Sequence, residues 1–164
     1  MTADQILSTE FLTQLSGAID RFYDGEQGSF NQGYEHFHSA AGQATLVKAA
    51  ANELGLKSII VGTDALPEGT LHPEGDGAGY DWALVAGRWI VDLWRLSYHG
   101  DGPVVYDLSE PGQMEIAERT FGPRGRWEEL AEDPQEIELA TQIWHDFTVP
   151  YHAVDDLLGG LPER

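Results

Sequence analysis

The chain of 164 residues contains no cysteine, which excludes disulfide bonds, thiolate metal ligands and a thiol nucleophile. Basic residues are scarce: nine Lys and Arg stand against 28 Asp and Glu, for a net charge of −19. A surface this acidic repels the phosphate backbone, so we expect no direct binding of nucleic acid. No stretch approaches the roughly 18 apolar residues of a membrane-spanning helix, and Lys and Arg do not cluster at the start as in a signal peptide. We therefore expect no membrane binding and a cytoplasmic location.

The surplus of acids has three interpretations. Only two of the basic residues are lysines, Lys48 and Lys57, as is typical of the acid-rich proteins of salt-loving organisms. Alternatively, the acidic surface binds a basic partner or imitates DNA, or the charge only keeps the protein soluble. The acids are dispersed along the chain, which favours DNA imitation less than a block of acids would.

A hydrophobic content of 41% with five Trp predicts one folded domain over residues 1–164. The pattern predicts an α+β fold in which helices flank a small antiparallel sheet. Helices are expected over residues 4–23, 39–54, 113–119, 127–132, 134–145 and 154–158, so residues 113–158 form a C-terminal helical region. Ser39 is expected to cap the second of these helices, Gly55 to end it, and Pro134 to be the first residue of the helix over 134–145. Strands are expected over residues 58–62, 82–85, 88–92 and 104–106, with a hairpin turn at Ala86-Gly87.

Residues 42–95 show an ordered set of short motifs. Gly42-Gln43-Ala44 lies in the first turns of the second predicted helix, Tyr80-Asp81-Trp82 begins a strand, and Asp92 ends the next strand after Gly-Arg-Trp-Ile-Val. This order resembles the core of the papain-like and transglutaminase-like superfamily of cysteine hydrolases. In that family a Gly-x-Cys opens the central helix, a His-x-Trp begins a strand, and an acid ends the following strand. The resemblance implies a papain/transglutaminase-like core.

The same resemblance assigns Ala44 to the nucleophile position, Tyr80 or Asp81 to the His position, and Asp92 to the acid position. A methyl group cannot attack a carbonyl, and neither Tyr nor Asp is an imidazole base. His72 comes too early for the strand and His99 too late, so neither is expected at the His position. The chain is expected to lack thiol catalysis as given.

These positions lead to three functional hypotheses. The first is a pseudoenzyme that binds a protein or peptide partner, possibly a basic one. The second is a peptidase, amidase or deamidase whose Cys at position 44 has been replaced in this chain. The third is an acidic inhibitor that imitates nucleic acid. Loss at two of the three catalytic positions favours natural degeneration, and therefore the first hypothesis.

Aromatic residues are concentrated in the predicted sheet and just after it. Trp82, Trp94 and Tyr98 are candidate binding residues, because exposed Trp and Tyr are favoured anchors at interfaces. Alternation along the strands makes core packing the competing interpretation, and it allows Trp82 and Trp94 to lie on opposite faces.

One motif suggests a metal, and none suggests a cofactor. His36 and His38 would project from one face of a strand, in a geometry that suits zinc, with Glu35, His72, Asp76 or Asp81 as a third ligand. The competing interpretation is that they are polar residues at the entry of a helix. The glycines at positions 75, 77 and 79 precede a strand and do not open a helix, so no dinucleotide or other cofactor is expected.

Overall fold

The computed structural model describes residues 3–24, 37, 39–67, 72–75, 77–100 and 102–147. They form an antiparallel five-stranded sheet in the order β4-β3-β2-β1-β5. The strands are β1 (Ser58–Thr63), β2 (Tyr80–Val85), β3 (Trp89–Val91), β4 (Val105–Asp107) and β5 (Glu128–Glu129). The helices are α1 (Ala3–Ile6), α2 (Thr9–Asp24), α4 (Ala40–Glu53), α5 (Pro111–Phe121) and α6 (Pro134–Phe147), with a π-helix η1 (Arg95–His99) and a 3₁₀ turn η2 (Arg124–Arg126). The predicted α+β class with a small antiparallel sheet is confirmed.

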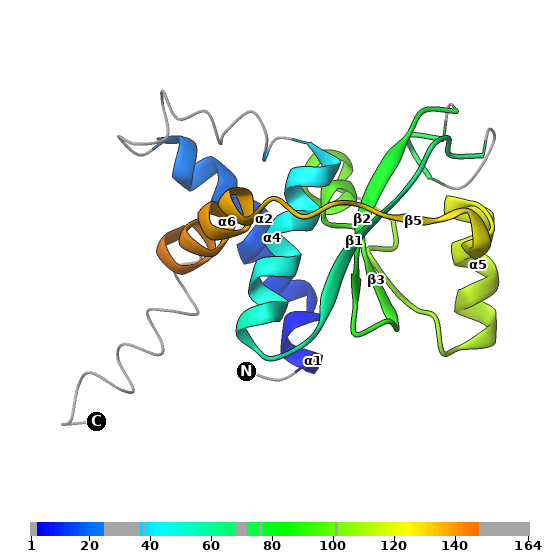
Figure 1. Ribbon diagram of the computed structural model, residues 1–164, viewed down its shortest axis with the longest axis horizontal. Helices are drawn as coiled ribbons and strands as arrows, with labels where there is room; N and C mark the ends of the chain where they lie inside the picture. Colours follow the sequence, from blue (N-terminus) through cyan, green and yellow to red (C-terminus); the bar gives the residue numbers. More distant parts are fainter. Residues whose placement is uncertain are drawn as a thin grey trace.

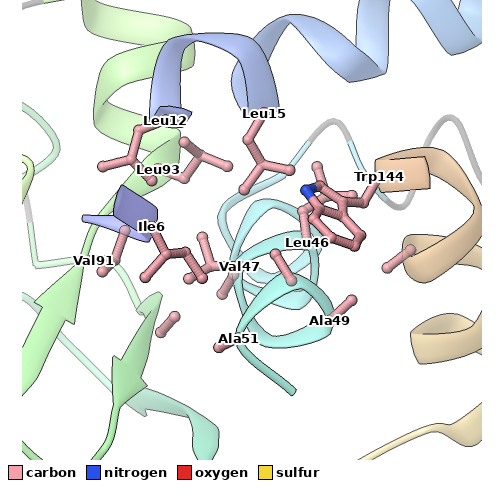
Figure 2. Close-up of a cluster of buried hydrophobic side chains, with 14 of the residues drawn as sticks. Ile6, Leu12, Leu15, Leu46, Val47, Ala49, Ala51, Val91, Leu93 and Trp144 are labelled. Carbon is pink, nitrogen blue, oxygen red and sulfur yellow. The ribbon is translucent and has the colours of Figure 1, made fainter. Parts of the chain in front are cut away.

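The sheet lies between two layers of helix (Figure 1). Helix α4 packs against one face, with α2 and α6 behind it, and α5 covers the other face. The larger hydrophobic cluster fills the α4 side, where side chains of α1, α2, α4, α6 and β3 meet (Figure 2). A second cluster fills the α5 side and is rich in aromatic rings, including Tyr80, Trp82, Tyr106 and Phe121. Alternation along β2 explains the division, because Tyr80 and Trp82 point to one face and Ala83 is buried on the other.

Helix α4 is the central helix of the fold. Ser39 caps its start, as predicted, because the Ser39 hydroxyl oxygen accepts the Gly42 N–H at 3.0 Å. Gly55 follows its end with φ of 75°, a left-handed conformation that suits glycine. Residues 42–51 are all buried, since the sheet covers one side of the helix and α2 and α6 cover the other.

Two predicted helices differ from the structure. The helix expected over residues 4–23 is broken after Ile6, because Ser8 caps a new helix: its Oγ accepts the Phe11 N–H at 3.1 Å. The helix expected over residues 127–132 is wrong. Residues 128 and 129 instead form β5, which pairs with the free edge of β1, and the Leu130 N–H donates to the Ile60 carbonyl oxygen at 2.8 Å. Pairing with β1 satisfies the backbone hydrogen bonds of residues 128–130, whereas a short, acid-rich helix at this place would have little packing to stabilise it.

The remaining elements follow the sequence closely. Pro134 is the first residue of α6, as predicted for a residue that lacks an N–H. The hairpin between β2 and β3 turns at Ala86 and Gly87, both with positive φ, and the Arg88 N–H donates to the Val85 carbonyl oxygen at 3.0 Å. Within the described ranges, no helix is both long and apolar enough to cross a membrane. The helix predicted over residues 154–158 lies outside the described part of the chain.

Candidate functional site

Asp92 is the centre of a buried polar cluster at the end of β3. The Tyr80 hydroxyl donates to its Oδ1, and His72 Nε2 bonds to its Oδ2 at 2.8 Å. The Arg95 backbone N–H also reaches Oδ1, at 3.3 Å. The side chains of His72 and Asp92 are both 0% exposed. We call this group the His72–Asp92–Tyr80 cluster.

The strand register explains why Tyr80 and Asp92 meet. Ala83 pairs with Val91, so Asp92 follows beside Trp82, on the face that Tyr80 also occupies. His72 comes from the loop between β1 and β2, and its ring packs against Tyr80 with centroids 4.3 Å apart. The same ring lies 5.6 Å from that of Phe121, which ends α5. Helix α5 and the loop thus close the cluster from outside the sheet.

The hydrogen bonds of His72 define the roles of its two ring nitrogens. The Glu74 backbone N–H donates to His72 Nδ1 at 3.1 Å, so Nδ1 is an acceptor and carries no proton. Nε2 is therefore the ring nitrogen that donates to Asp92 Oδ2. Both ring nitrogens are engaged within the protein, and neither is left to accept a proton from a substrate.

Burial sets the state of Tyr80 as well. Loss of contact with water raises the pKa of the Tyr80 hydroxyl far above its usual range, and the negative charge of Asp92 raises it further. Tyr80 therefore stays protonated and acts as a hydrogen-bond donor to Asp92. The Asp92 carboxyl group is thus held by the Tyr80 hydroxyl, the His72 ring and the Arg95 backbone N–H.

Ala44 lies in a different environment from this cluster. It is the fifth residue of α4, is 1% exposed and belongs to the hydrophobic cluster on the α4 side. Tyr80 belongs to the cluster on the α5 side. The structure thus brings Tyr80 together with Asp92, and it places Ala44 in the packed layer across the sheet.

Asp81 points to the face opposite Tyr80. It pairs with Gly62 of β1, and a Cβ added at Gly62 would lie only 2.2 Å from Asp81 Oδ1. Glycine at position 62 therefore leaves the space that the carboxylate occupies. Burial raises the pKa of Asp81 above its usual value. Of the two residues predicted for the His position, Tyr80 is the one that contacts Asp92.

Glu74 connects the His72–Asp92–Tyr80 cluster to a second set of polar and aromatic side chains at the surface. Glu74 Oε2 accepts the Trp94 indole N–H and lies 3.1 Å from His99 Nε2. The Tyr98 ring stacks on Trp94 with centroids 4.8 Å apart and an interplanar angle of 13°. Tyr98 is 62% exposed, the one large hydrophobic side chain in the described segments that stands out into solvent. We call Glu74, Trp94, Tyr98 and His99 the Tyr98 patch.

The three aromatic residues predicted to bind a partner therefore separate. Trp82 is 1% exposed and packs on Phe121 and Trp127 in the core, so it offers no surface to a partner. Trp94 packs against the same hydrophobic cluster as Trp82, which corrects the expectation of opposite faces. Trp94 lies in the helical turn that follows β3. Trp94 and Tyr98 lie together at the surface.

The predicted metal site lies outside the described structure. His36 and His38 are both beyond the described ranges, as are Glu35 and Asp76 among the candidate third ligands. In the parts of the chain that are described, no three His, Asp or Glu side chains are placed to hold a metal ion. The metal hypothesis stays a prediction.

Sequence reasoning missed three residues of this region: His72, Glu74 and His99. The position of His72, eight residues before the strand, predicts no place beside Asp92, but His72 Nε2 bonds to Asp92 Oδ2. A contact between a loop histidine and an acid at the end of a strand has no fixed spacing, so no motif could have revealed it. Comparison with protein-family models, curated proteins and solved structures gives no match.

Proposed function

We propose that this chain is a catalytically inactive domain of papain/transglutaminase-like architecture that binds a basic segment of a partner protein or peptide. The observation that carries the proposal is that His72 is buried in the His72–Asp92–Tyr80 cluster with both ring nitrogens hydrogen-bonded inside the protein. A general base needs a free lone pair within reach of the substrate. His72 has neither, because both ring nitrogens are engaged and the side chain is fully buried.

The proposed architecture draws support from the order and packing of the elements. A central helix with Gly42-Gln43-Ala44 in its first turns packs on the strand that begins with Tyr80, and Asp92 follows the next strand. Tyr80 donates to Asp92 from the position where the family has its His. We interpret this bond as a structural replacement for a catalytic one. With no cysteine in the chain, the nucleophile of that family is missing as well.

Binding of a basic segment is supported by charge and by one exposed ring. A net charge of −19 attracts cationic partners and speeds their encounter. Exposed tyrosines are favoured anchors at protein interfaces. Tyr98 is 62% exposed and stacks on Trp94, whose indole N–H donates to the Glu74 carboxylate. Together these features favour a partner that presents positive charge.

Two measurements test the proposal. Fluorescence anisotropy with labelled nine-residue peptides of net charge +4, 0 and −4 should show saturable 1:1 binding of the basic peptide alone. Its affinity should fall at least tenfold between 50 and 500 mM KCl, because exposed charge pairs are screened over that range. In parallel, fluorogenic amide and ester substrates should show no turnover above that of a His72→Ala variant. Turnover that depends on His72, or no saturable binding of the basic peptide, would refute the proposed function.

A further inference from the structure

We propose that the Tyr98 patch is a binding site for an arginine side chain, with the guanidinium stacked on the Tyr98 ring and paired with the Glu74 carboxylate. The inference rests on the proposed function for its partner, a basic segment, and it names the residue that this segment must contain. Three properties of the patch support it: an exposed aromatic ring, a carboxylate held at the edge of the aromatic stack, and a rigid support beneath both.

The ring is the first property. Trp94 stacks nearly parallel to the Tyr98 ring, and the His99 ring lies almost perpendicular to it with centroids 5.0 Å apart. Tyr98 is nevertheless 62% exposed. A cation is attracted to the face of an aromatic ring when it lies within about 6 Å of the centroid. The chain already contains one such contact, in which the Arg88 guanidinium carbon lies 4.6 Å from the centre of the Trp89 ring. The neighbouring Arg95 is buried and bonded to Tyr106.

The carboxylate is the second property. Glu74 Oε2 is held by the Trp94 indole N–H and by His99, which fixes the carboxylate at the edge of the aromatic stack. The Glu74 side chain is 36% exposed, so the charge remains open to solvent. A planar guanidinium can stack on a ring and donate to a carboxylate at the ring's edge at the same time. An ammonium group is a compact, strongly hydrated charge that does not stack in this way.

The third property is the support beneath the patch. Helix η1, which carries Tyr98, is tied to the closed cluster by the Arg95 N–H bond to Asp92. It is tied to α4 by the Ser97 hydroxyl, which donates to Gln43 Oε1 at 2.8 Å. Glu74 is tied to the same cluster by its backbone bond to His72. The ring and the carboxylate are therefore held in place before a ligand arrives, which lowers the entropy cost of binding.

The experiment compares three peptides that differ at one central residue: arginine, lysine or citrulline, the last being uncharged but nearly isosteric with arginine. The flanking residues are identical and carry three positive charges. With the wild-type chain, anisotropy titrations should show the arginine peptide binding at least fivefold more tightly than the lysine peptide, and the citrulline peptide binding most weakly. Tyr98→Ala should remove the preference for arginine over lysine, and Tyr98→Phe should keep it, because the ring face is retained.

Charge variants separate the patch from the general acidity of the chain. Glu74→Gln should lower affinity for the arginine peptide at least fivefold, while the amide oxygen can still accept the Trp94 N–H. Glu115→Gln, an equal change of charge at an exposed position on α5, should alter it less than twofold. Circular dichroism confirms that each variant is folded.

The outcomes distinguish this inference from the proposed function. If all three peptides bind, but with equal affinity and unchanged by Tyr98→Ala, the arginine site is refuted and the binding of basic segments stands. If the lysine peptide binds more tightly than the arginine peptide, the arginine site is also refuted. If none of the peptides binds, the proposed function itself is refuted.

Discussion

Three donors converge on one buried carboxylate at Asp92: the Tyr80 hydroxyl, the His72 ring and the Arg95 backbone N–H. A carboxyl group out of water is stable only when such donors replace its hydration. Each partner therefore contributes more to stability than a surface hydrogen bond does, and the cluster fixes the loop that carries Glu74. Loss of a partner of Asp92 should therefore lower the stability of the fold more than loss of a partner in a surface pair of the same chemistry.

Replacing His72 by alanine should destabilise the fold by at least about 2 kcal/mol, because an unpaired buried polar group costs about 1–3 kcal/mol and the lost ring leaves a cavity. His145 provides the matched control, since its Nε2 lies 2.7 Å from Glu53 Oε1 in a pair that is partly exposed. His145→Ala should cost about 1 kcal/mol or less. Urea unfolding at pH 7 measures both. Equal losses in the two variants would contradict the buried-cluster account.

Asp81 gives a prediction with a defined pH dependence. Burial raises its pKa in the folded state, so ionisation of Asp81 carries a penalty in the free energy of folding. The penalty is absent below the pKa of the unfolded chain, near 3.8, and is complete above the raised pKa of the folded state. Asp81→Asn should therefore raise the melting temperature at pH 7 and leave it nearly unchanged at pH 3. A variant that is less stable than the wild type at pH 7 would contradict this sign.

The hairpin and the central helix show how far the sequence predicts the elements. Ser39, Gly55 and Pro134 are read correctly as helix boundaries, because capping depends on residues within one turn of the helix end. The strand after Trp127 is not predicted, because β5 exists only through its pairing with β1, in which Glu128 lies opposite Gly62 and Glu129 opposite Val61. The same holds for the candidate site. The contact of Tyr80 with Asp92 follows from the alternation and pairing of the strands, whereas that of His72 with Asp92 depends on a loop and has no sequence signal.

The cap of α4 can be tested at the level of the element. Ser39→Ala removes the acceptor for the Gly42 N–H and should cost about 1 kcal/mol of stability. Ser16 is the control, because it lies inside α2 and its hydroxyl donates to the Thr13 carbonyl oxygen in a hydrogen bond that is exposed to solvent. Ser16→Ala should be neutral or slightly stabilising, since alanine is the better helix former. A cost for Ser39→Ala no larger than that for Ser16→Ala, measured by urea unfolding, would show that the cap contributes nothing.

On the scale of the whole molecule, a net charge of −19 opposes compaction. Salt screens this repulsion over about 10 Å at 0.1 M, so raising KCl from 10 mM to 1 M should raise the melting temperature. Affinity for a basic peptide should fall over the same range, because its charge pairs are screened too. Calorimetry and anisotropy measure the two responses separately. A melting temperature that stays flat or falls with KCl would contradict the claim that repulsion matters here.

The most direct test of the account uses the five Trp side chains as reporters. Their indole N–H signals in a ¹⁵N-labelled sample come from the core at Trp82 and Trp144, from the Tyr98 patch at Trp94, and from two partly buried positions. Titration with the arginine peptide should shift the Trp94 signal progressively to saturation and leave those of Trp82 and Trp144 in place. A Trp94 signal that does not move while the peptide binds would contradict the account.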